Sequence, residues 1–307
     1  MLAPGFTTRF APAPTGHLHL GHAVNAVWVW GIARAYGGRV LLRIEDHDRG
    51  RCRPAYETSI LDDLDWLGLV PDGASTAVLR RGPHAQRQSD DLTRYADRLI
   101  ALEADGLAYP CRCSRADVER AQPGADGTEP RYPGTCRTAG VPPDETPARR
   151  VTIADGLESF DDLRLGPQTQ RPAVDVGDVL VRDRHGQFTY QFAVTVDDFE
   201  QRVDLIIRGE DLLASTGRQF RLARMLGRME MPRVLHHPLV HHPDGRKLSK
   251  SAGDTGIREL RAAGRSPAEV LGMAAHLSGR LPTPRPVEAR ALADLFDADG
   301  WGQIPAR

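Results

Sequence analysis

The sequence predicts an α/β fold whose core is a doubly wound parallel sheet, interrupted by an inserted subdomain and followed by a short helical region. Strand-like and helix-like segments alternate towards both ends of the chain, as is typical of parallel strands joined by helices. The middle is instead rich in proline, glycine and cysteine, and the residues after Ser251 carry a helical apolar pattern. We therefore expect a sheet that the middle segment splits in two.

The first helices and strands are predicted from the spacing of apolar residues and from the glycines and prolines that interrupt them. Glycines end the predicted helices, and Pro54 suits the first turn of one of them. The expected elements are a strand at 6–10, a helix from Leu20 that stops at Gly37, a strand at 39–44, a helix from Pro54 to Gly68 and a helix at 92–104. Together they predict the first half of a nucleotide-binding domain at residues 1–106.

The later segments predict the rest of the domain organisation. Residues 107–171 form the expected insertion, after which apolar, β-like segments return at 179–181, 188–196 and 203–207. Residues 172–251 are therefore expected to complete a split Rossmann-type sheet. Helical stretches at 257–263 and 267–277 predict a helical C-terminal region at 252–307.

The overall composition is that of a water-soluble protein. The chain has 307 residues and a net charge of −1, and its start lacks the basic and apolar regions of a signal peptide. The most apolar stretch, 23–33, is too short to cross a bilayer. We expect a cytoplasmic monomer with no membrane partner, in which local arginine patches rather than net charge would hold a nucleic acid.

The only two lysines, Lys247 and Lys250, lie three positions apart, whereas all other basic residues are arginine. A compact ammonium on a flexible stem reaches phosphate in a way that the wide arginine fork does not, so this segment predicts phosphate chemistry. The alternative is a chance pair of exposed lysines in one loop.

A second candidate site lies in the turn between the first strand and the first helix. Gly16 favours a tight turn, Gly21 permits close approach of a nucleotide, and His19 and His22 stand at a helix N-terminus that favours phosphate. Taken alone, the two histidines are equally consistent with a surface pair or half of a metal site.

Together, His19-Leu20-Gly21-His22 and Lys247-Leu248-Ser249-Lys250-Ser251 resemble the two signature motifs of class I aminoacyl-tRNA synthetases. The segments at 9–16, 42–46, 190–194 and 207–211 are similar to the glutamyl-tRNA synthetase branch, and the resemblance covers about residues 6–277. It implies a glutamate pocket formed by Arg9, Phe10, Ala11, Pro12, Ala13, Glu45, Tyr190 and Arg208. Two guanidinium groups suit a substrate with two carboxylates, and Glu45 suits its ammonium. A strand-end salt bridge between Arg9 and Glu45 is the structural alternative.

The same resemblance implies activation of L-glutamate by ATP with Mg²⁺, giving glutamyl-adenylate without a protein nucleophile. The implied catalytic residues are His19, His22 and Lys250, and the implied ATP-binding residues are Gly16, His19, Gly21, His22, Lys247 and Lys250. The pairs at 236–237 and 241–242 are open to interpretation as metal ligands or as an ordinary approach to the lysine loop.

Three of the four cysteines lie within 26 residues, and without a secretory signal metal binding outranks a disulfide framework. The pattern of Cys111, Cys113, Tyr132 and Cys136 is similar to the zinc site of glutamyl-queuosine tRNA(Asp) synthetases, which implies a structural Zn²⁺. Unliganded thiols are the alternative, and Cys52 is expected to be a free thiol.

The 56 residues after Ser251 are too few for the large anticodon-binding region of a full glutamyl-tRNA synthetase. This and the cysteine pattern resemble the glutamyl-queuosine tRNA(Asp) synthetases, and the resemblance implies transfer of glutamate to queuosine in the anticodon of tRNA(Asp). A compact enzyme that charges a tRNA acceptor end and a catalytically silent tRNA- or glutamate-binding paralogue remain alternatives. The arginine-rich stretch 218–233 is expected either to contact phosphate or to form a solvated helix face.

Overall fold

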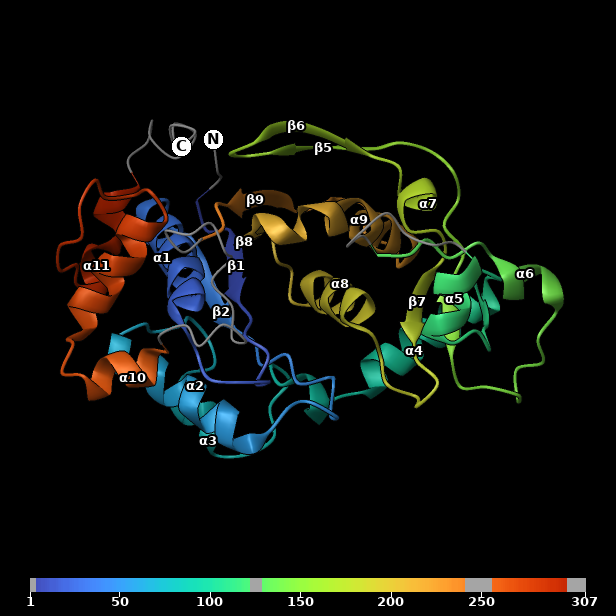
Figure 1. Cartoon of the computed structure of the whole chain (residues 1–307), viewed down its shortest axis with the longest axis horizontal. Coiled ribbons are helices and arrows are strands. Elements are labelled where there is room, and N and C mark those ends of the chain that lie inside the picture. Colours follow the sequence, from blue (N-terminus) through green and yellow to red (C-terminus); the bar gives the residue numbers. More distant parts are fainter. Residues whose placement is uncertain (1–3, 122–128, 241–255, 297–307) are drawn as a thin grey trace.

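A parallel sheet forms the centre of the computed structural model, which describes residues 4–121, 129–240 and 256–296 (Figure 1). Strand β1 (Thr7–Phe10) pairs in parallel with β2 (Arg39–Leu42), and β8 (Leu205–Gly209) pairs in parallel with β9 (Arg233–His237). The two pairs lie side by side, because the N–H of Asp204 donates to the carbonyl of Thr7 at 2.8 Å. The predicted α/β class with a parallel sheet is confirmed.

The three helices predicted in the first half are found as α1 (Leu20–Ala35), α2 (Pro54–Leu67) and α4 (Thr93–Ala104). Two short helices, α3 (Thr76–Arg80) and the 3₁₀ helix η1 (Gln88–Asp90), were not predicted. Gly68, which ends α2, adopts the left-handed conformation with φ 70°. No helix in the described ranges is long and apolar enough to span a membrane.

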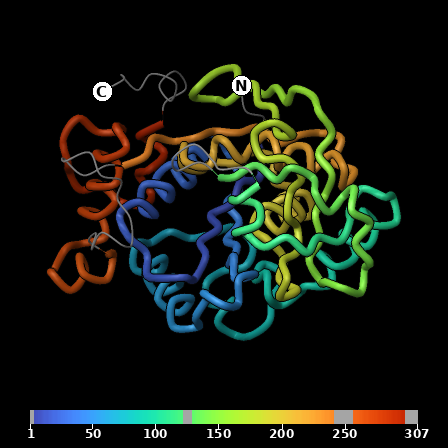
Figure 2. Tube along the Cα trace, turned by 45° about the vertical axis from the view of Figure 1, so that its right-hand side comes forward, coloured from blue at the N-terminus to red at the C-terminus, as the bar shows by residue number. Residues whose placement is uncertain are grey.

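The C-terminal region packs against α1, as Figure 2 shows by the red segments beside the blue helix. It contains α10 (Ile257–Ala262), α11 (Pro267–Leu277) and the 3₁₀ helix η4 (Ala289–Leu295). Gly31 of α1 is required by this packing, since a Cβ there would lie 2.1 Å from the ring of Phe296. Both predicted C-terminal helices are confirmed.

A second, antiparallel sheet at the opposite end of the molecule joins the predicted insertion to the segment that follows it (Figure 1). Its strands are β3 (Ala108–Pro110), β4 (Arg149–Val151) and β7 (Val179–Arg182), accompanied by α5 (Arg115–Ala121), α6 (Thr135–Ala139) and α7 (Pro172–Asp175). Strand β5 (Glu158–Asp162) pairs with β9 of the central sheet and forms a hairpin with β6 (Gly166–Gln170). Strand pairing thus crosses the expected boundary at residue 171 in both directions, and the division into domains remains a prediction.

One predicted element is wrong. The apolar segment 188–196, expected to be β-like, lies mostly in helix α8 (Tyr190–Glu200), whereas the expected strands at 179–181 and 203–207 are found in β7 and, from residue 205, in β8. A short apolar run does not distinguish a buried strand from a buried helix. Helix α8 packs against α4, α9 (Thr216–Met225) and β7, so most of its residues are buried, polar ones included. The 3₁₀ helix η2 (Glu210–Ser215) precedes α9.

Candidate active site

The residues predicted to hold glutamate converge at the carboxyl ends of the central strands. Arg9 belongs to β1, Glu45 follows β2, Arg208 belongs to β8, and Tyr190 is the first residue of α8. Arg9, Glu45 and Arg208 are buried, with 5%, 5% and 3% of each residue exposed. Burial and the nearby Glu45 carboxylate raise the pKa of Tyr190, which therefore stays a neutral phenol.

Arg43 and Asp198 organise this pocket, although sequence reasoning gave them no role. Arg43 is fully buried and donates from Nη2 to Glu45 at 2.9 Å and from Nη1 to Asp198 at 2.8 Å. Arg9 donates from Nε to the same Asp198 oxygen at 3.0 Å. Arg9 therefore forms its ion pair with Asp198, and Glu45 forms its ion pair with Arg43. The alternative prediction of a salt bridge between Arg9 and Glu45 is wrong.

A second buried carboxylate, Asp197, supports this layer. It accepts hydrogen bonds from Gln88 Nε2 at 2.7 Å and from the Tyr95 hydroxyl at 2.9 Å. Gln88 in turn lies 2.6 Å from the ring of His47, whose centroid is 6.3 Å from that of Tyr190. His47 is thus tied to the pocket wall. The sequence did offer one signal for Asp197 and Asp198, because they are two adjacent charged residues that directly follow a mostly apolar segment.

Arg208 is held by three polar side chains outside the predicted glutamate site. It donates from Nε to His236 Nε2 at 3.0 Å, from Nη1 to Gln219 at 2.7 Å and from Nη2 to Thr216 at 2.8 Å. His236 Nδ1 lies 2.6 Å from a carboxylate oxygen of Asp162. Both ring nitrogens of His236 therefore have partners within the fold, Arg208 and Asp162. His241 and His242 lie outside the described residues.

The turn that precedes α1 borders a cleft of about 510 Å³, which Phe10, Ala11, Pro12 and Arg208 also line. His19 is the N-cap of α1, where its Nδ1 accepts the N–H of Gly21 at 3.1 Å. The N–H of His19 donates to Nδ1 of His22, also at 3.1 Å. Because both Nδ1 atoms accept, both rings carry their proton on Nε2 and present it as a donor. A Cβ on Gly21 would lie 2.9 Å from the His19 ring.

Of the other residues predicted for this site, the structure describes two and leaves two outside the described ranges. Ala13 and Gly16 lie in the same turn. Lys247 and Lys250 lie outside the described residues. His237 lines the cleft, and burial lowers its pKa to about 4.

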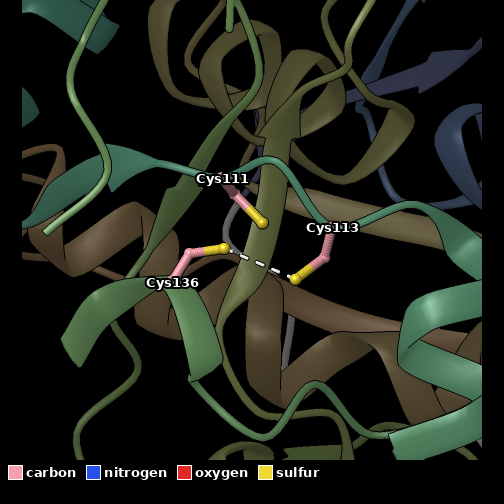
Figure 3. Close-up of side chains that lie close together, drawn as sticks. All are labelled: Cys111, Cys113 and Cys136. Carbon is pink, nitrogen blue, oxygen red and sulfur yellow. Dashed lines mark hydrogen bonds between the residues drawn. The ribbon is translucent and has the colours of Figure 1, made fainter. Parts of the chain in front are cut away.

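Cys111, Cys113 and Cys136 lie together in the insertion, with their side chains directed towards one another (Figure 3). Their sulfur atoms are all within 4.8 Å of one another. The Tyr132 hydroxyl lies 3.4 Å from Cys111 Sγ and accepts the N–H of Cys136 at 2.8 Å. Burial opposes ionisation of Cys136, but hydrogen bonds from Tyr132 and Cys113 outweigh it and lower its pKa to about 7. The cluster is compatible with zinc, which prefers thiolate ligands.

The arginines of 218–233 have structural partners. Arg221 and Arg224 pair with Glu158, and Arg218 pairs with Glu129 at 2.7 Å. Arg228 donates to the carbonyls of Asp198 and Val203. These contacts give Arg218, Arg221 and Arg228 a role in tertiary packing, whereas Arg224 and Arg233 are exposed and contact with phosphate stays a prediction.

Comparisons with known proteins agree with this geometry. A family model described as tRNA synthetases class I (E and Q), catalytic domain, matches residues 6–279. The protein named glutamyl-Q tRNA(Asp) synthetase in Symbiobacterium thermophilum is 42% identical over 97% of this chain and 94% of its own length. Its namesake in Nitratidesulfovibrio vulgaris is 40% identical over 97% of this chain and 93% of its own length.

Proteins named for another activity also match. Glutamate–tRNA ligase 2 of Chelativorans sp. is 36% identical over 98% of this chain and 62% of its own length. The crystal structure of glutamate-tRNA synthetase from Elizabethkingia anophelis has a TM-score of 0.78 and 26% identity, covering 95% of this chain and 66% of that one. The chain therefore belongs to the catalytic-domain family of class I tRNA synthetases (E and Q), a family of ligases, as its motifs predicted.

Proposed function

We propose that the protein activates L-glutamate with ATP and Mg²⁺ and transfers the glutamyl group to queuosine in the anticodon of tRNA(Asp). The observation that carries the proposal is that the Tyr190 side chain lies within electrostatic reach of Glu45, Arg208 and Arg9, while Arg208 also lines the cleft of His19 and His22. The relatives named glutamyl-Q tRNA(Asp) synthetase support the choice of acceptor.

In the first step the α-carboxylate of glutamate attacks the α-phosphate of ATP, and pyrophosphate leaves with Mg²⁺. Arg9 and Arg208 hold the substrate carboxylates, and Glu45 holds the ammonium. The Nε2–H groups of His19 and His22 stabilise the charge that develops on the phosphate. Phe10, Ala11, Pro12 and Ala13 line the pocket, and Gly16, Gly21, Lys247 and Lys250 bind ATP, with Lys250 acting on the phosphates.

In the second step an acceptor hydroxyl attacks the glutamyl carbonyl, an ester bond forms, and AMP leaves. A second cavity, of about 540 Å³, supports this step because Tyr190 and Gln191 line it together with Cys113 and Tyr132 of the insertion. Its volume suits a nucleoside-sized ligand. An acceptor bound there would lie beside Tyr190, at the wall of the glutamate pocket.

The insertion is proposed to carry a structural Zn²⁺ held by the thiolates of Cys111, Cys113 and Cys136 and by the Tyr132 hydroxyl. The close approach of the four groups supports this ligand set. Bound zinc would cross-link the two segments that carry them. We further propose that the protein is cytoplasmic and that it is a monomer. Size-exclusion chromatography with light scattering tests the oligomeric state.

The acceptor is tested with labelled glutamate and two purified tRNA pools, one containing queuosine and one lacking it. Labelling only of queuosine-containing tRNA(Asp), lost after periodate oxidation of the queuosine diol, is the expected result. Labelling of tRNA(Glu) regardless of queuosine would instead support the second candidate, tRNA charging, which the relatives named glutamate–tRNA ligase favour. A protein without glutamate-dependent pyrophosphate exchange would be the silent paralogue.

A further inference from the structure

Arg208 is buried, and three side chains fix the orientation of its guanidinium. Only 3% of the residue is exposed, and its Nε, Nη1 and Nη2 each donate to a neighbouring side chain, His236, Gln219 and Thr216 respectively. The remaining N–H bonds are on Nη1 and Nη2. These are the groups of a planar fork that bind a carboxylate in a bidentate manner.

The contact with His236 determines where this histidine carries its proton. Arginine only donates, so His236 Nε2 has to accept, and the ring proton is on Nδ1. The Nδ1–H then donates to Asp162 Oδ2 at 2.6 Å. Burial lowers the pKa of His236 more than the Asp162 carboxylate raises it, so the ring is neutral near pH 7. A charged imidazolium would place a donor against the donor of Arg208.

Asp162 is committed to the role of acceptor. Its Oδ1 accepts the N–H groups of Arg164 and Leu165 at 2.9 and 2.8 Å, and its Oδ2 accepts the N–H and the Nδ1–H of His236. Burial opposes its ionisation, but these bonds outweigh burial and lower its pKa. A carboxylate surrounded by donors admits one tautomer of His236, the one that accepts from Arg208.

We propose that Asp162 and His236 are positioning residues for glutamate, which act through Arg208 and make no contact with the substrate. Asp162 fixes the tautomer of His236, and His236 fixes the plane of the guanidinium so that Nη1 and Nη2 face a substrate carboxylate. The inference rests on the proposed function in one respect, the binding of glutamate by Arg208. It assigns a role in substrate binding to the end of β5, which belongs to the segment expected to be an insertion.

The first test is the variant Asp162→Asn. An amide that donates to His236 Nδ1 moves the ring proton to Nε2, where it opposes the Nε–H of Arg208. We expect the dissociation constant for L-glutamate, measured by calorimetry, to rise roughly tenfold, as loss of a hydrogen bond to a charged group does. The KM for ATP in pyrophosphate exchange should stay unchanged. The ¹⁵N shifts of His236 should report the change of tautomer.

The matched control is Glu158→Gln. Glu158 lies on the same strand, is 4% exposed and binds the guanidinium groups of Arg221 and Arg224, neither of which is a hydrogen-bond partner of Arg208. We expect this variant to lower the melting temperature while leaving glutamate affinity unchanged. If it weakens glutamate binding as much as Asp162→Asn, the effect is general destabilisation and the positioning role is wrong.

Variants of His236 keep the proposal testable if Asp162→Asn fails to fold. His236→Gln retains an oxygen that accepts from Arg208, whereas His236→Leu does not, so the glutamine variant should bind glutamate more tightly. Equal affinities would reject the positioning role. In the His236→Gln background, the further change Asp162→Asn should have no added effect on glutamate affinity.

Arg208→Lys separates the two proposals. Unchanged glutamate affinity in this variant would show that Arg208 does not bind the substrate, and the assigned glutamate site would be wrong. Loss of affinity in Arg208→Lys with normal affinity in Asp162→Asn would reject only the positioning role.

Discussion

Asp198 accepts a hydrogen bond from Nε of Arg9 at 3.0 Å, across 189 residues of sequence. The carboxylate is buried together with Arg43, which donates to the same oxygen. Burial opposes its ionisation, but the two guanidinium groups outweigh burial and lower its pKa. Asp198 thus pairs with two buried cations beside the proposed glutamate pocket, and Glu45 is a second partner of Arg43.

Removal of the Asp198 charge should both destabilise the protein and weaken glutamate binding. Asp198→Asn leaves Arg9 and Arg43 undercompensated, and breaking a buried ion pair in this way costs about 3–5 kcal/mol of the free energy of unfolding. Urea unfolding measures this loss, and calorimetry should show weaker glutamate binding because Arg9 loses its anchor. Asp155→Asn is the control, because Asp155 also binds an arginine, Arg171 at 3.0 Å, but on the surface. Equal stability of the two variants would contradict the prediction.

His237 should make stability depend on pH. Its pKa of about 4 in the fold lies below the value of about 6.5 in an unfolded chain. Between these pH values the unfolded state binds a proton that the folded state does not, so stability is complete above about pH 6.5 and decreases as pH falls. The slope is at most about 1.4 kcal/mol per pH unit. Urea unfolding at several pH values should show a smaller decrease for His237→Leu, and identical slopes would refute this assignment.

The sequence predicted the parts of the site that short motifs specify. His19 and Gly21 belong to one turn, and Arg9 and Arg208 stand at the ends of apolar strands, so local patterns locate them. Asp198 and the Asp162–His236 pair depend on contacts across 189 and 74 residues, for which one sequence provides no pairing signal. Helix α8 was missed because its short apolar run, 192–196, fits a buried strand as well as a buried helix.

The cysteine cluster should lose metal when one ligand is removed. We expect Cys111→Ser to release zinc, because Cys111 is buried with its sulfur next to the Tyr132 hydroxyl. Cys52→Ser is the matched control and should keep its zinc, since Cys52 lies outside the cluster. Metal content by atomic absorption and the melting temperature are the measurements. Equal zinc in both variants would reject the ligand assignment.

His19→Asn should separate catalysis from the structure of the turn. Asparagine is a favoured N-cap residue and its oxygen replaces Nδ1 as acceptor for the N–H of Gly21, but it has no counterpart of the Nε2–H. Loss of one preorganised donor to a developing charge costs about 100- to 1000-fold in rate. We therefore expect glutamate-dependent pyrophosphate exchange to slow by this factor, with glutamate affinity and melting temperature unchanged. A nearly normal exchange rate would mean that His19 only caps α1, and the phosphate would then depend on His22 and the lysine loop.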